Sequence, residues 1–184
     1  MCSILAYTEG RMRIGLGANV TPTPSMQMLA QLIQQEEGYA PGTTSYADNN
    51  PGNLVYAGQP GATQGPGGFA VFDSYQDGLQ ALYNQLNLYA TGACQACNGQ
   101  PQTIASMTAI YAPAGQGNNN PAAYASFLAS GMGVDSDTSL SDIFDGSVDA
   151  STSPEPMGID VTDPTTIIVA GLAAVALLVV VMNA

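Results

Sequence analysis

The sequence predicts a mainly α-helical domain of the α+β class with one small β-hairpin, followed by an acidic linker and a transmembrane helix. Apolar residues recur at helical spacing in several stretches between residues 24 and 145. Only two short runs in this region have the composition of strands. A long uncharged apolar run occupies residues 165–183.

The first helix is predicted over residues 24–37, after a poorly patterned segment, residues 1–23, that we expect to be a flexible arm. Ser25 is a candidate N-cap. One apolar face is formed by Met26, Leu29, Ala30 and Ile33. Gly38 is a plausible stop signal, which places Glu37 in the last turn of the helix.

A long hairpin is predicted next, with short strands at residues 54–56 and 69–72. The glycine-rich residues 57–68 would connect them, and Pro51-Gly52 marks a tight turn before the first strand. The remainder of residues 39–73 is expected to be loop.

The strongest helical pattern covers residues 74–90, where Ser74 and Asp77 have the spacing of a capping box. Its predicted buried stripe consists of Leu79, Leu82, Leu86 and Tyr89. A shorter helix is predicted over residues 103–112 with Thr103 as its N-cap.

Another helix is predicted over residues 120–130. Asn120 followed by proline is a typical start, and Gly131 is the predicted stop. Its inward side chains would be Tyr124, Phe127 and Leu128. Residues 139–144 add one last turn or two, so the predicted domain covers residues 24–145.

The C-terminal part of the sequence changes character. Residues 146–164 are rich in Asp, Ser, Thr and Pro and predict a mobile acidic linker. At about 1.5 Å per residue, the run at 165–183 is long enough to cross a bilayer. A buried C-terminal helix is the alternative, but the run is apolar on all faces, which favours a membrane span.

The cysteines give little chemistry. Cys94 and Cys97 form a lone CxxC, and only Cys2 remains as a further thiol, whereas a structural zinc site needs four ligands. We therefore expect a loop clip or two free thiols, with no metal and no cofactor.

Charge excludes several classes of function. The net charge is −12, and the basic residues, Arg11 and Arg13, both lie near the start. Because phosphate contacts need cations, nucleic-acid binding is not expected. The sequence has no histidine, which excludes a His-based triad or His-ligated metal within this chain. Any catalysis must use carboxylates, hydroxyls, amides or thiols.

A series of short motifs occurs in order along the chain: Glu37-Gly38-Tyr39, Asn49-Asn50-Pro51-Gly52-Asn53-Leu54, Phe69-Ala70-Val71-Phe72, Gly78-Leu79-Gln80-Ala81-Leu82, Thr103-Ile104, Tyr111-Ala112-Pro113, Asn118-Asn119-Asn120, Tyr124 and Gly133-Val134. This order resembles a phage and bacterial family of lysozyme-like, lytic-transglycosylase-like domains, often described as phage structural proteins. The resemblance covers about residues 26–140. It implies a lysozyme-like fold, in which a glutamate at a helix end faces a cleft and a small hairpin forms the opposite wall.

Glu37 matches the family's glutamate by its Glu-Gly-aromatic setting, and the resemblance implies that it is the catalytic general acid and base. The negative end of the helix dipole and partial burial would both raise its pKa, which suits a general acid. Glu36 is the adjacent alternative. Asp48 is the nearby candidate for a second carboxylate, although a single acid suffices when the substrate's own N-acetyl group assists.

Four other residues are candidates for substrate binding. Asn50 and Asn53 would either hold sugar amides or brace the loop of Glu37, and the sequence leaves these roles open. Tyr56 and Tyr111 would either stack on a sugar ring or belong to the core.

Two classes of function follow from these expectations. The first is a membrane-anchored, peptidoglycan-cleaving protein. With no secretory signal peptide predicted, delivery in the membrane of a virus particle would bring it to its substrate. Its expected partners are peptidoglycan glycan strands, the lipid bilayer at residues 165–183 and other virion proteins. The alternative is a non-catalytic virion structural or wall-binding protein with the same fold.

Overall fold

The computed structural model describes residues 19–117 and 119–148. Its helices are α1 (Pro24–Glu36), α2 (Thr44–Ala47), α3 (Tyr75–Thr91), α4 (Ile104–Tyr111), α5 (Pro121–Met132) and α6 (Leu140–Asp145), with 3-10 turns η1 (Pro66–Gly68) and η2 (Gln95–Cys97). A two-stranded antiparallel sheet pairs β1 (Ala62–Gln64) with β2 (Ala70–Phe72). The prediction of a mainly α-helical domain with one small sheet is confirmed. The predicted linker and membrane span lie outside the described residues.

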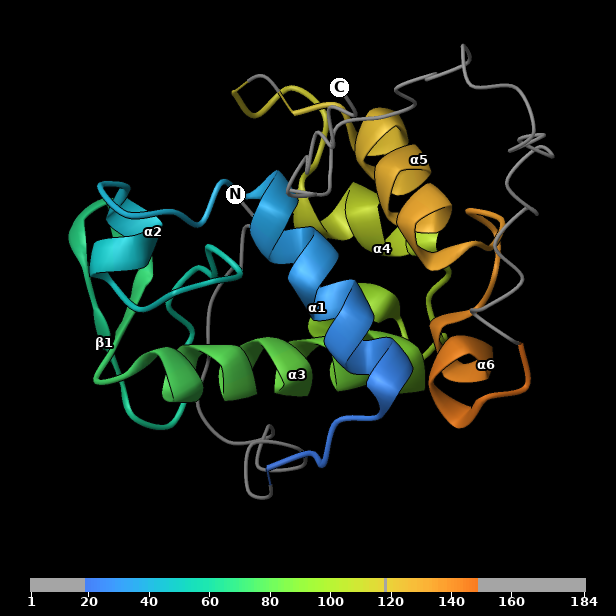
Figure 1. Cartoon of the computed structure of the whole chain (residues 1–184), viewed down its shortest axis with the longest axis horizontal. Coiled ribbons are helices and arrows are strands. Elements are labelled where there is room, and N and C mark those ends of the chain that lie inside the picture. Colours follow the sequence, from blue (N-terminus) through green and yellow to red (C-terminus); the bar gives the residue numbers. More distant parts are fainter. Residues whose placement is uncertain (1–18, 118, 149–184) are drawn as a thin grey trace, which may run out of the picture. The chain divides into compact units, whose positions relative to one another are not determined.

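Helix α1 lies at the centre of the helical part (Figure 1). It packs against α3, α5 and α6, and α5 packs in turn on α4. The sheet and α2 lie beyond the C-terminal end of α1, on the opposite side from α5 and α6 (Figure 1). The largest fully buried apolar side chains are Tyr89, Leu29, Ile33, Leu82, Leu86, Ile104, Met107, Leu128, Met132, Leu140 and Ile143.

Helix α1 begins one residue after Thr23, which is the N-cap in place of the predicted Ser25. The Thr23 hydroxyl accepts a hydrogen bond from the Met26 amide, and Pro24 occupies the first helical position, which needs no donor. The Ser25 hydroxyl donates to the carbonyl of Ile143 instead, at 2.7 Å, and so joins α1 to α6.

The predicted hairpin is wrong in its first strand. Strand β1 lies within the glycine-rich stretch expected to be a connection, and its Ala62 pairs with Phe72. Residues 54–56 contribute a single bridge, Val55 to Phe69, on the way into the turn. The short helix α2 was also missed, because Thr43 caps it within a stretch rich in turn-forming residues.

Helix α5 continues through Gly131, which was predicted to stop it, and ends at Gly133 in the left-handed conformation. Gly131 instead permits close packing. A Cβ added there would lie 2.6 Å from the side chain of Leu32 in α1. A glycine inside a helix can therefore mark a helix contact rather than a helix end.

The remaining caps agree with the sequence. Ser74, Thr103 and Asn120 each accept a hydrogen bond from a backbone amide of the first turn that follows. Residues 95–97 form η2 beside a disulfide between Cys94 and Cys97, so of the two alternatives for this pair the loop clip is the one present.

The described end of the predicted arm is fixed to α3. The Val20 amide donates to Asn84 at 3.0 Å, and the Gln80 side chain donates to the Val20 carbonyl at 2.9 Å.

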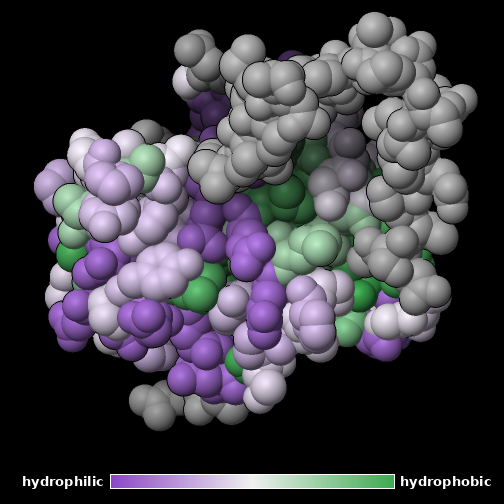
Figure 2. Space-filling view, in the orientation of Figure 1, coloured by the Kyte–Doolittle hydropathy of each residue, from purple (hydrophilic) through white to green (hydrophobic). Residues whose placement is uncertain are grey.

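None of the helices in residues 19–117 and 119–148 has both the length and the apolar character needed to span a bilayer. In the view of Figure 2, which has the orientation of Figure 1, hydrophilic residues cover most of one side of the visible surface and hydrophobic residues gather toward the other side.

Candidate functional site

Glu37 lies at the C-terminal cap of α1, where two backbone hydrogen bonds fix the end of the helix. The Gly38 amide donates to the Gln35 carbonyl and the Tyr39 amide to the Gln34 carbonyl, which is the pattern of a Schellman motif. This motif needs a left-handed residue after the cap, and Gly38 supplies it with φ +65°. The backbone of Glu37 is thus held in one position by its glycine neighbour.

Two hydrogen bonds orient the carboxyl group of Glu37. The Tyr124 hydroxyl, from α5, donates to Oε1 at 3.0 Å, and the Asn53 amide donates to Oε2 at 3.2 Å. A carboxylate has about four acceptor positions, so each oxygen keeps room for a proton or another partner. The two hydrogen bonds therefore orient the carboxyl group of Glu37 without occupying all of its acceptor positions.

Burial raises the pKa of Glu37 above its ordinary value of 4.5, and the charge of Glu36 adds to the rise. The hydrogen bonds from Tyr124 and Asn53 act in the opposite direction, but burial is the larger effect. Every charged side chain in residues 19–148 is acidic, so this part of the chain holds no side-chain cation to stabilise the carboxylate. Glu37 therefore keeps its proton to a higher pH than an exposed glutamate.

Burial also raises the pKa of Tyr124, and the negative charge of Glu37 raises it further. The Tyr124 hydroxyl consequently stays protonated and remains a donor. Its ring meets that of Tyr111 edge-on, with centroids 6.2 Å apart and planes at 87°. This residue was expected only as an inward side chain, and the spacing of the motif series gave no signal of its bond to Glu37.

The turn that carries Asn53 is braced by Asn50. The Asn50 side chain, 1% exposed, donates to the carbonyls of Leu54 and Ala70, both at 2.9 Å, and accepts from the Leu54 amide at 2.8 Å. Of the two roles expected for Asn50, this geometry fits bracing rather than direct contact with a substrate. Asn53 has φ +47°, a conformation that asparagine tolerates better than most residues, and this directs its amide to Glu37.

Gly78 lets the turn approach α3 closely. A Cβ at this position would lie 1.9 Å from the carbonyl oxygen of Asn49 and 2.9 Å from Pro51. No side chain can occupy that space unless the turn moves. Gly78 therefore sets the distance between α3 and the segment that delivers Asn53.

The two candidate stacking tyrosines are both partly buried and pack against the core. Tyr111 donates its hydroxyl hydrogen to the Gly52 carbonyl and contacts the rings of Tyr89 and Tyr124. Tyr111 therefore supports the turn at Gly52, and these contacts hold its side chain in place. Tyr56 pairs through its backbone amide with Gly68, beside the sheet.

The other candidate acids are placed differently. Glu36 is exposed. The Asp48 carboxylate is near the β1–β2 connection, since a Cβ on Gly65 would lie 3.9 Å from its Oδ2. In the described part of the chain, no group of three or more His, Cys, Asp or Glu side chains could hold a metal ion.

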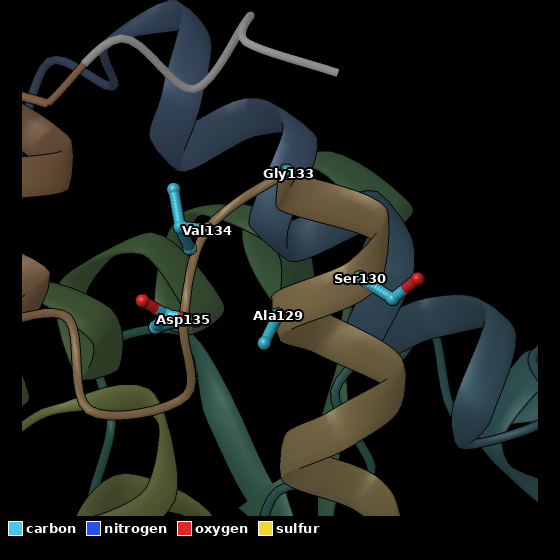
Figure 3. Close-up of a pocket in the computed structure, with 5 residues that line it drawn as sticks. All are labelled: Ala129, Ser130, Gly133, Val134 and Asp135. Carbon is cyan, nitrogen blue, oxygen red and sulfur yellow. The ribbon is translucent and has the colours of Figure 1, made fainter. Parts of the chain in front are cut away.

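A pocket in the structure lies elsewhere, at the C-terminal end of α5 (Figure 3). Its walls are Ala129, Ser130, Gly133, Val134 and Asp135. Ser130 points to the opposite side of α5 from Val134 and Asp135 (Figure 3). This open hollow offers one carboxylate and few other polar groups, and it does not include the Glu37 group.

Comparisons with family models, curated proteins and solved structures find no match to this chain. The chemistry open to the Glu37 group therefore follows from its own geometry.

Proposed function

We propose that this chain cleaves glycan strands of peptidoglycan, with Glu37 as the general acid and afterwards the general base. The carrying observation is a partly buried carboxyl group with a raised pKa, oriented by Tyr124 and Asn53. Glycosidic cleavage requires a proton on the leaving oxygen, and a raised pKa keeps that proton on Glu37 to a higher pH than on an ordinary glutamate.

Glu37 would donate its proton to the glycosidic oxygen while the bond to the sugar carbon breaks. The transition state carries positive charge on the sugar ring, and the acidic surroundings favour that charge. Among the described residues the Glu37 carboxyl group is bonded to Tyr124 and Asn53 and to no second carboxylate, so the neighbouring N-acetyl oxygen of the substrate would stabilise the cation. Glu37, now ionised, would then take a proton from water or from a sugar hydroxyl while the oxygen of that group forms a new bond to the anomeric carbon and releases the N-acetyl oxygen.

A lysozyme-like fold is part of the same proposal. The glutamate follows the central helix, a small sheet and its turn stand on one side, and α5 stands on the other (Figure 1). The motif series along residues 26–140 supports this assignment. We further propose that residues 165–183 anchor the protein in a membrane, and that this membrane belongs to a virus particle.

The decisive comparison is peptidoglycan clearing by the full chain and by Glu37→Gln. We expect Glu37→Gln to lose at least about 100-fold in rate, a typical contribution of a general acid. Glu36→Gln is the matched control, because it removes the exposed carboxylate one residue earlier and should retain activity. Absence of clearing by the wild type, or equal clearing by Glu37→Gln, would reject Glu37 catalysis.

A second candidate function is a non-catalytic, wall-binding or structural domain. The observation that favours it is the Tyr124–Glu37–Asn53 network itself, since it joins α5, the end of α1 and the turn and can serve stability alone. In that case wild type and Glu37→Gln would both sediment with peptidoglycan, and neither would clear it. Recovery of the protein in purified particles would support the virion assignment, and recovery only in host envelopes would oppose it.

A further inference from the structure

Three tyrosines from three different segments meet beside the C-terminal end of α1. The ring of Tyr39 lies 5.1 Å from that of Tyr46, in α2, and 5.6 Å from that of Tyr75, the first residue of α3, measured between centroids. The planes are tilted by 44° and 39°, so the rings pack without stacking face to face. We call these three residues the tyrosine cluster.

The cluster is partly open to solvent. Tyr46 is 44% exposed, while Tyr39 and Tyr75 are partly buried. Among the described large hydrophobic side chains, only Met28 is comparably exposed, also at 44%. An exposed aromatic side chain supported by two further rings offers an apolar face with a polar hydroxyl edge, which suits a partner of mixed polarity.

The cluster is also held in place. The Tyr75 hydroxyl donates to the side chain of Gln34 at 2.9 Å, and the Tyr39 amide donates to the Gln34 carbonyl at 3.0 Å. Tyr46 lies in the short helix α2, and its backbone amide donates to the side chain of Thr43, the N-cap of this helix. Because these bonds exist in the free protein, a ligand would meet rings that need little further ordering.

Its position relates it to Glu37. Gln34 lies in the last turn of α1, and Glu37, which caps this helix, follows it by three positions, about 4.5 Å further along the helix axis and on the same side. Tyr39 follows Glu37 by two residues, in the same Schellman motif. A sugar chain whose scissile bond lies at Glu37 extends over several ring lengths, so it must cross neighbouring surface.

We propose that Tyr39, Tyr46 and Tyr75 form a stacking platform for a pyranose ring of the glycan strand, next to the sugars joined by the bond that Glu37 cleaves. This inference rests on the proposed function. Sugar rings present C–H faces that pack on aromatic rings and hydroxyl edges that bond to polar groups. Residues 19–148 carry no cationic side chain, so the platform is unsuited to phosphate or carboxylate groups and is compatible with a neutral sugar ring.

The experiment measures binding of a soluble, uncharged N-acetylglucosamine hexamer to the full chain in the Glu37→Gln background, so that cleavage does not interfere. We expect Tyr46→Ala to weaken binding about 3- to 10-fold, as befits the loss of one ring contact. Tyr46→Phe, which keeps the ring, should bind nearly as well as the parent. Met28→Ala is the matched control, because it removes an equally exposed apolar side chain from α1 and should leave binding unchanged.

Unchanged binding in Tyr46→Ala, an equal loss in Met28→Ala or no binding by the parent would overturn the platform. The proposed function stands or falls separately, on the clearing by wild type and Glu37→Gln. A melting curve for Tyr46→Ala that matches its parent shows that the substitution has not unfolded the domain.

Discussion

At the scale of single residues, Glu37 differs from the other described carboxyl groups in its surroundings. Burial raises its pKa, and its two hydrogen-bond donors come from segments 16 and 87 residues away in sequence. The nearby Glu36 has neither the burial nor these partners. One position along α1 therefore separates an exposed carboxylate from a candidate acid.

Stability should depend on pH through Glu37. Because its pKa is raised in the folded protein, the folded state holds this proton more tightly than the unfolded chain does. The contribution to the free energy of unfolding is full below about pH 4.5 and is lost as the pH rises through the raised pKa. We expect the melting temperature of Glu37→Gln, relative to that of the wild type, to increase as the pH rises from 4 to 8. A constant difference across this range, or the same trend in Glu36→Gln, would contradict the assignment.

Tyr124→Phe tests the other side of the same hydrogen bond. The substitution removes a donor that stabilises the ionised form of Glu37, so the pKa of Glu37 should rise further and activity should persist to higher pH. We expect a loss of about 1–3 kcal/mol in the free energy of unfolding near neutral pH and a smaller loss at pH 4. Denaturant unfolding at the two pH values and a pH–rate profile measure this. Tyr83→Phe, at a partly buried tyrosine of α3, is the control and should leave the profile in place.

At the scale of elements, the site depends on how closely the Asn49–Asn53 turn approaches α3. The turn is held by Asn50 from within and by the Tyr111 hydroxyl from α4. Gly78 provides the space on the helix side. These contacts decide where the Asn53 amide lies relative to the end of α1.

Gly78→Ala should therefore impair the site as well as the fold. The added methyl group overlaps the Asn49 carbonyl oxygen, so the turn must move away and withdraw Asn53 from Glu37. We expect a loss of at least about 1–3 kcal/mol in stability, the range for overpacking, together with a clear loss of peptidoglycan clearing.

Gly131→Ala is the matched control within a helix. Its added methyl group meets the side chain of Leu32 rather than a backbone atom. A small shift of α5 or a rotation of the Leu32 side chain can therefore relieve the overlap. We expect reduced stability with clearing retained, and partial recovery of stability when Leu32→Ala is added. Equal losses of clearing in Gly78→Ala and Gly131→Ala would show that the turn has no special part in the site.

At the scale of the whole described domain, charge has one sign. Cell walls are often anionic, so long-range repulsion should oppose association at low salt. Raising the ionic strength from 0.01 M to 0.15 M shortens the screening length from about 30 Å to about 8 Å. We expect sedimentation with peptidoglycan to increase over this range, while binding of the neutral hexamer stays constant. A decrease in both would contradict the electrostatic argument.

The sequence by itself determined the helical class, most helix starts and the candidate acid, because caps, apolar periodicity and a glycine stop act over a few residues. It also identified the Asn50–Asn53 turn. It did not locate β1 or α2, because short elements in glycine- and threonine-rich segments depend on pairing and packing with distant residues. Only the tertiary structure decided that Tyr124 and Asn53 meet at Glu37 and that Gly78 sets the approach of the turn. Those contacts join residues far apart in the chain, and no local pattern records such distances.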